Sequence, residues 1–88
     1  MSDQNQDTSF LLDITGETCP MTFVRARLML DRLPPGARLT IRLQGEEPLR
    51  GVPRQAAALG HAVLATAPES PDRTAPGDVW LVTLRKAG

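Results

Sequence analysis

The sequence predicts an α+β fold, a two-layer sandwich in which two helices cover one face of a mixed four-stranded sheet. Apolar runs of strand length alternate with two segments of helical periodicity, in the order β-α-β-α-β-β. Turns rich in Pro and Gly separate these segments. The chain has 88 residues, which suit one small domain, so all six elements should share one core.

The first half of the chain contains a predicted β-α-β unit. The apolar run Phe10–Ile14 predicts a strand, and the periodicity of Pro20–Leu33 predicts a helix that stops where Pro34 cannot continue it. Strict alternation over Arg38–Gln44 predicts a half-buried strand. Because a helix joins the two strands, we expect them to be parallel, with a right-handed crossover.

The second half of the chain predicts a helix followed by two strands. A loop is expected over Gln44–Pro48 and a helix over Leu49–Leu59. Pro53 should lie in the first turn of this helix, because a proline in the interior costs about 3 kcal/mol. Strands are expected at Ala62–Ala67 and Val79–Arg85, on either side of a proline-rich loop.

The composition restricts the class of protein. Ten basic and ten acidic residues cancel, which gives no general reason to bind nucleic acid. The polar, acidic residues 1–8 predict a disordered tail, and residues 9–88 a single domain. No apolar run approaches the roughly 20 residues that span a bilayer. With one cysteine no internal disulfide forms, which fits a reducing cytoplasm. We also expect a monomer, with no metal site and no cofactor.

That cysteine, Cys19, lies at the predicted strand-to-helix junction, before Pro20 at the first helical position. A helix N-terminus stabilises a thiolate by about 0.3–1 kcal/mol, which lowers the pKa by less than about one unit. His61 follows the second helix and should lie near the opposite edge, so no neighbouring base is expected. This arrangement favours a thiol that accepts a group and passes it on, although a small buried side chain remains the alternative.

Topology predicts the neighbours of Cys19. Parallel strands end at the same edge of a sheet, so the loop after the second strand should face the Cys19 turn. The expected neighbours are Glu46, Glu47 and Arg50. The two carboxylates would oppose a thiolate, and Arg50 would offset them.

The first helix has two apolar stripes. One is the natural core face, and the other is either an exposed docking surface or the margin of the core. The core face holds Phe23, Ala26, Met29, Leu30 and Leu33, and the candidate docking stripe holds Met21, Val24 and Leu28 among Arg25, Arg27 and Arg32.

The segment Asp13-Ile14-Thr15-Gly16-Glu17-Thr18-Cys19-Pro20-Met21-Thr22 resembles the TusA family of small sulfur-carrier proteins. That family has an Asp-x-x-Gly-x-x-Cys lead-in and a Cys-Pro-x-Pro motif. The resemblance implies that Cys19 carries a persulfide from a cysteine desulfurase or rhodanese-type donor to an acceptor in tRNA thiolation, molybdenum-cofactor assembly or other sulfur metabolism. Gly16 and Pro20 would shape the helix start. Thr22 departs from the second proline of the motif, which affects the choice of partner more than the thiol chemistry.

A second hypothesis comes from a different class of protein. The chain could be a regulatory or adaptor module of the same fold, in which Cys19 is a structural relic and the docking stripe binds a protein. Whether the chain is an enzyme, a sulfurtransferase, is left open by the sequence. Direct nucleic-acid binding is the weakest reading, because the basic residues are better explained as solvated faces.

Overall fold

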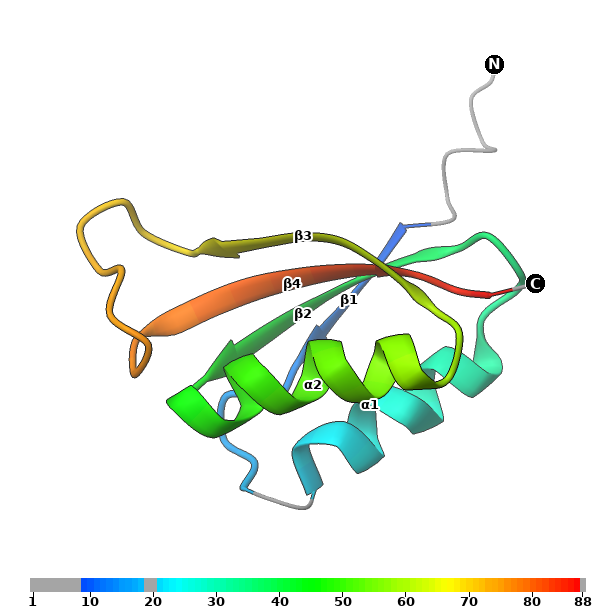
Figure 1. Ribbon diagram of the computed structural model, residues 1–88, viewed down its shortest axis with the longest axis horizontal. Coiled ribbons are helices and arrows are strands. Elements are labelled where there is room, and N and C mark those ends of the chain that lie inside the picture. Colours follow the sequence, from blue (N-terminus) through cyan, green and yellow to red (C-terminus); the bar gives the residue numbers. More distant parts are fainter. Residues whose placement is uncertain (1–8, 19–20, 88) are drawn as a thin grey trace.

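The computed structural model describes residues 9–18 and 21–87. The predicted tail, residues 1–8, lies outside the described residues. Two helices lie on the same side of a four-stranded sheet (Figure 1), which confirms the predicted two-layer α+β sandwich and its element order. The elements are β1 (Ser9–Asp13), α1 (Met21–Arg32), β2 (Arg38–Gln44), α2 (Glu46–Ala58), β3 (Ala62–Pro68) and β4 (Val79–Arg85).

The sheet is mixed, with the strand order β1-β2-β4-β3. β1 pairs with β2 in parallel, and Asp13 at the end of β1 lies opposite Arg42. β4 is antiparallel to both β2 and β3. The parallel pair confirms the prediction for the first two strands. Because β1 and β2 run in the same direction, the segments that follow them leave the sheet at the same end.

The core lies between the helices and one face of the sheet. Leu39, Ile41 and Leu43 of β2 alternate toward the helices and are fully buried. This is the alternation that the sequence predicted for a half-buried strand. The rest of the core comes from the helices, β4 and the connecting segments, namely Ile14, Ala26, Leu30, Leu33, Ala37, Val52, Ala56, Val82 and Leu84.

The start of α2 differs from the prediction. The helix begins at Glu46, so the segment expected as a loop up to Pro48 forms its first turn. Gly45 allows this start because its φ of 119° turns the chain directly after β2. Pro48 therefore occupies the first turn, and Pro53 lies in the helix interior, not in the first turn as predicted. A proline there removes the backbone N–H that would donate to the carbonyl oxygen of Leu49.

Smaller differences occur at other element ends. β1 runs over Ser9–Asp13, one residue earlier than predicted, although the Ile14 amide still donates to the carbonyl oxygen of Arg42 at 2.9 Å. α1 ends at Arg32, one residue before the predicted end, and β3 extends to Pro68. The predicted ranges of β2 and β4 are confirmed.

The end of α1 is held by the C-terminal segment of the chain. The Lys86 ammonium donates to the carbonyl oxygens of Leu30 at 2.5 Å and Leu33 at 3.1 Å. Leu30 lies in the last turn of α1 and Leu33 directly follows the helix, at an end where backbone carbonyl oxygens lack the usual helical partners. Close by in the sequence, the Ala87 amide donates to Nδ1 of His61 at 2.9 Å. At the end of the molecule where both helices finish, side chains therefore hold the chain together through hydrogen bonds to backbone groups.

Candidate functional site

The turn between β1 and α1 is organised by Asp13. Its carboxylate accepts hydrogen bonds from the Thr15 amide at 2.9 Å and the Thr15 hydroxyl at 2.7 Å. This is the local bond by which an Asp side chain stabilises a turn. The Glu17 amide then donates to the carbonyl oxygen of buried Ile14 at 3.0 Å, so the lead-in segment is held at two successive points.

Cys19 and Pro20 lie outside the described residues, but the residues on either side of them are described. The amide of Met21, the first residue of α1, donates to the carbonyl oxygen of Thr18 at 2.7 Å. The two ends of the segment that holds the cysteine are thus joined directly. The predictions that Cys19 is an accessible thiol at the helix N-terminus, and that Pro20 sets the helix start, stay predictions.

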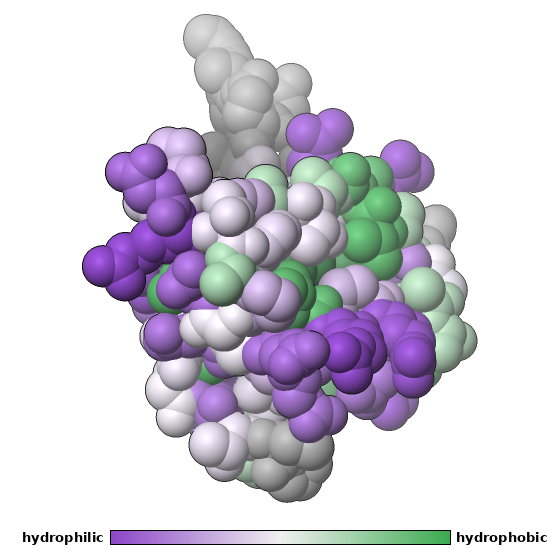
Figure 2. All heavy atoms as spheres, turned by 60° about the vertical axis from the view of Figure 1, so that its left-hand side comes forward, coloured by the Kyte–Doolittle hydropathy of each residue, from purple (hydrophilic) through white to green (hydrophobic). Residues whose placement is uncertain are grey.

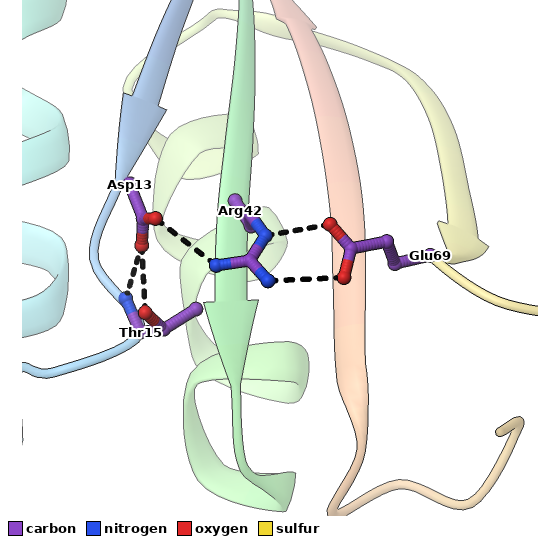
Figure 3. A network of polar contacts seen from close by, with 4 residues as sticks. All are labelled: Asp13, Thr15, Arg42 and Glu69. Carbon is purple, nitrogen blue, oxygen red and sulfur yellow. Dashed lines mark hydrogen bonds and ion pairs between the residues drawn. The ribbon is translucent and has the colours of Figure 1, made fainter.

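Asp13 also belongs to a network of ion pairs (Figure 3). Arg42 donates through Nη1 to Asp13 at 3.0 Å, and through Nε and Nη2 to the two carboxylate oxygens of Glu69 at 2.6 and 3.1 Å. Such a two-pronged Arg–carboxylate contact fixes direction as well as distance. We call Asp13, Arg42 and Glu69 the strap.

The strap is ionised at neutral pH. The backbone and side-chain hydrogen bonds from Thr15, followed by the bond from Arg42, lower the pKa of Asp13 below its ordinary value of 3.8. The hydrogen bonds from Arg42 lower the pKa of Glu69 below 4.5. The same contacts raise the pKa of Arg42. Each partner therefore favours the charged form of the other.

The charge of Glu17 is also paired. Its carboxylate lies 2.6 Å from Nη1 of Arg25, one turn into α1. Glu17 lies in the lead-in and Arg25 among the basic residues of the first helix, and no contact between them was expected from the sequence. Their eight-residue separation falls outside the spacing of helical neighbours, so only the folded turn brings them together.

The expected neighbours of Cys19 lie in the first two turns of α2. Glu46 and Arg50, four positions apart in the helix, form an exposed ion pair at 3.1 Å. Together with Glu47 they line a hollow of about 570 Å³ on the helix surface. Because β1 and β2 are parallel, the start of α2 and residues 14–18 after β1 both lie at the end of the molecule where these strands finish (Figure 1). Contact between these residues and Cys19 stays a prediction.

Figure 2 brings this end of the molecule forward. Most of its surface is hydrophilic or of intermediate hydropathy, and hydrophobic residues occupy smaller areas. Within residues 9–18 and 21–87, no three His, Cys, Asp and Glu side chains gather as a metal site. No helix of this described part is long and apolar enough to cross a membrane.

Gly16 and Thr22 have different surroundings. Gly16 is exposed, and a Cβ placed on it would meet nothing within 4 Å. Its φ lies outside the region that favours glycine, so neither space nor backbone conformation requires a glycine here. Thr22, in the first turn of α1, is buried, with 5% of its surface exposed. The residue that replaces the second proline of the motif therefore packs in the protein interior.

The candidate docking stripe on α1 is exposed. Met21, Val24 and Leu28 have exposed fractions of 42%, 39% and 54%, which resolves the earlier alternative in favour of the surface. Phe23 and Met29, predicted to face the core, are only partly buried and pack at its margin. The reason is geometric, because the helix presents one narrow face, centred on Ala26 and Leu30, to the sheet. The binding of a protein to the stripe stays a prediction.

Comparisons with known proteins agree with this architecture. The family model described as sulfurtransferase TusA matches residues 11–86. An Archaeoglobus fulgidus protein described as "Putative sulfur carrier protein" is 40% identical over 55 residues. That match covers 62% of this chain and 62% of the relative. The crystal structure of a SirA-like protein from Desulfitobacterium hafniense has the same fold, with a TM-score of 0.65, 22% identity, and coverage of 90% of this chain and 99% of that one.

Proposed function

Because the chain belongs to the TusA family, we propose that it is a sulfur carrier that holds persulfide sulfur on Cys19. The Cys19 thiolate attacks the terminal sulfur of a donor persulfide. The donor S–S bond breaks, the donor cysteine leaves as a thiolate, and Cys19 becomes a persulfide. A nucleophile of the acceptor then takes the terminal sulfur and releases the Cys19 thiolate, so the relay is balanced without an external oxidant or reductant.

The observation that carries this proposal is the construction of the lead-in. Asp13 of the Asp-x-x-Gly-x-x-Cys pattern holds the turn through Thr15 and is itself held by Arg42. The pattern is therefore a physical unit in this protein as well as a sequence match. Cys19 follows that unit directly and is the only cysteine in the chain.

The position of His61 supports a carrier over an independent enzyme. His61, the only histidine, follows the far end of α2, and its Nδ1 accepts the hydrogen bond from Ala87. A helix of 13 residues is about 20 Å long, so His61 lies far from the start of α2. A hydrolytic cysteine enzyme needs an adjacent base to activate its thiol. A relay needs none, because the donor already supplies an activated sulfur.

The proposed partners are two proteins that visit Cys19 in turn. The donor is a cysteine desulfurase or rhodanese-type protein, and the acceptor belongs to tRNA thiolation, molybdenum-cofactor assembly or other sulfur metabolism. We place the relay in the reducing cytoplasm, where a free thiol persists. The carrier acts as a monomer, without direct contact to nucleic acid and without a cofactor.

An experiment with labelled sulfur tests the proposal. The protein is incubated with a desulfurase and labelled cysteine, and the label bound to protein is measured together with the mass gained. We expect one added sulfur on the wild type and none on Cys19→Ser. The matched control is a double variant, Cys19→Ser with Ser9→Cys. It keeps one thiol, at an exposed position at the start of β1, and should gain little label.

The adaptor alternative makes the opposite prediction. It is favoured by the exposure of Met21, Val24 and Leu28, a feature that a docking module also needs. If folded wild-type protein takes no sulfur from any desulfurase or rhodanese donor, the carrier proposal fails and the adaptor reading stands.

A further inference from the structure

We propose that Arg42 is a positioning residue for Cys19, and that it acts through the strap across the open face of the sheet. This inference rests on the sulfur-carrier function proposed above. It assigns a role to two side chains, Arg42 and Glu69, that lie outside the Asp-x-x-Gly-x-x-Cys-Pro pattern.

The strap joins both edges of the sheet at one end. Arg42 lies on β2 and meets Asp13 at the end of β1, one edge strand. On its other side the register partner of Arg42 is Leu81 of β4, yet its guanidinium bonds to Glu69, which follows β3 at the opposite edge. Arg42 therefore reaches across the uncharged Leu81. Figure 3 shows this arrangement, with Arg42 between the two carboxylates.

The strap acts on the turn that leads into Cys19. The same Asp13 carboxylate that binds Arg42 also binds the amide and hydroxyl of Thr15. Arg42 thus limits the directions in which the Asp13 carboxylate can point. A small displacement of a reacting group can cost a large factor in rate, even when its cause is distant from the chemistry.

The strap also fastens the segment after β3. The Glu69 amide donates to the carbonyl oxygen of Val79 at 3.0 Å, so both the backbone and the side chain of Glu69 are held. The following loop is closed by its own bonds, including one from Nε1 of Trp80 to the carbonyl oxygen of Ala75 at 2.9 Å. The backbone that carries the Glu69 carboxylate is therefore held in place, so this carboxylate can fix the orientation of the Arg42 guanidinium.

Arg38 provides a matched control on the same strand. It lies four residues before Arg42, an even separation that places both side chains on the same side of the sheet, and it is exposed. Its register partner on β4 is Arg85. Among the described residues Arg38 forms no ion pair, whereas Arg42 forms two. The two arginines thus share residue type and face and differ in partners.

The test compares Arg42→Met, Arg42→Lys, Glu69→Gln and the control Arg38→Met. The rate of Cys19 alkylation by iodoacetamide is measured against pH, and sulfur transfer from a desulfurase is measured separately. For Arg42→Met we expect about a tenfold slower transfer. The alkylation midpoint should move up, by less than about one unit, toward the ordinary thiol pKa of about 8.5.

The conservative variants should show intermediate effects on sulfur transfer and on Cys19 alkylation. Lysine keeps the charge but lacks the fork that holds two carboxylates at once, so Arg42→Lys should lie between wild type and Arg42→Met. Glu69→Gln keeps an acceptor without the charge and should have a smaller effect than Arg42→Met. Arg38→Met should match the wild type in both measurements.

Two results overturn the proposal. One is an Arg42→Met protein, shown to be folded by its unfolding transition, whose alkylation profile and transfer rate equal those of Arg38→Met. The other is an Arg42→Lys protein that is as impaired as Arg42→Met while Glu69→Gln is unaffected. If the wild type accepts no sulfur, the carrier function fails, but the alkylation profile still decides whether Arg42 positions Cys19.

Discussion

The two ends of the molecule are stabilised in different ways. Where β1 and β2 finish, exposed carboxylates and guanidinium groups pair with each other, as in the strap and in Glu17 with Arg25. Where the helices finish, Lys86 and His61 bind backbone groups in partly buried positions. Exposed ion pairs contribute little stability but fix direction, whereas partly buried bonds to backbone contribute more. The difference indicates that the contacts where β1 and β2 finish mainly orient side chains, whereas the contacts where the helices finish mainly stabilise the fold.

The largest effect should come from the stable end. Lys86→Met leaves the carbonyl oxygens of Leu30 and Leu33 without their charged donor, and we expect a loss of about 1–3 kcal/mol in the free energy of unfolding. Urea denaturation measures this loss. The control Arg85→Met removes an exposed neighbouring charge and should change the stability by less than about 0.5 kcal/mol. A similar loss in both variants would contradict the role of the Lys86 contacts.

Two glycines at the end where β1 and β2 finish allow the effect of backbone geometry to be measured without changing any charge. Gly45 has a φ of 119°, and a Cβ there would lie 3.3 Å from Cδ of Pro48, so Gly45→Ala should cost about 1–2 kcal/mol. Gly16→Ala should instead stabilise the protein by up to about 1 kcal/mol, because it reduces the freedom of the unfolded chain. Thermal unfolding of both variants checks this contrast, and a loss in Gly16→Ala would show a constraint on that turn.

The smallest stability effect should be the response of the strap to acid. The folded-state pKa values of Asp13 and Glu69 lie below their ordinary values of 3.8 and 4.5, so both groups add stability above those values. This contribution disappears as the pH falls through the lowered values. Between pH 7 and acid, Glu69→Gln should therefore lose less stability than the wild type in urea titrations. An identical pH dependence would show that the strap contributes nothing to stability.

Much of the fold follows from local patterns in the sequence. The alternation of Arg38–Gln44 and the apolar run of Val79–Arg85 predicted two strands with their observed bounds. The start of α2 was predicted wrongly, because Pro53 was assumed to need a first-turn position while Gly45 and Pro48 form the actual start. A proline penalty is a local average, and the packing of Val52 and Ala56 in the core outweighs it here.

The candidate site divides in the same way. The motif around Cys19 was visible in neighbouring residues alone, whereas the second apolar stripe of α1 could be exposed or at the core margin until the structure showed Leu28 to be exposed. The pairs of Arg42 with Glu69 and of Arg25 with Glu17 were not predicted. Arg42 and Glu69 are 27 residues apart, and Arg42 lies on β2 while Glu69 directly follows β3, a strand that is not adjacent to β2 in the sheet. Sequence spacing carries no signal for such a contact.

The sequence by itself determined the element order, the parallel first pair of strands, the membership of the family and the identity of the single thiol, because these depend on periodicity, chain connection and residue type. Only the tertiary structure decided what holds the turn before Cys19. The physical reason is that the strap spans three segments of the chain, Asp13, Arg42 and Glu69, which become neighbours only when the sheet order β1-β2-β4-β3 places them along one end of its open face.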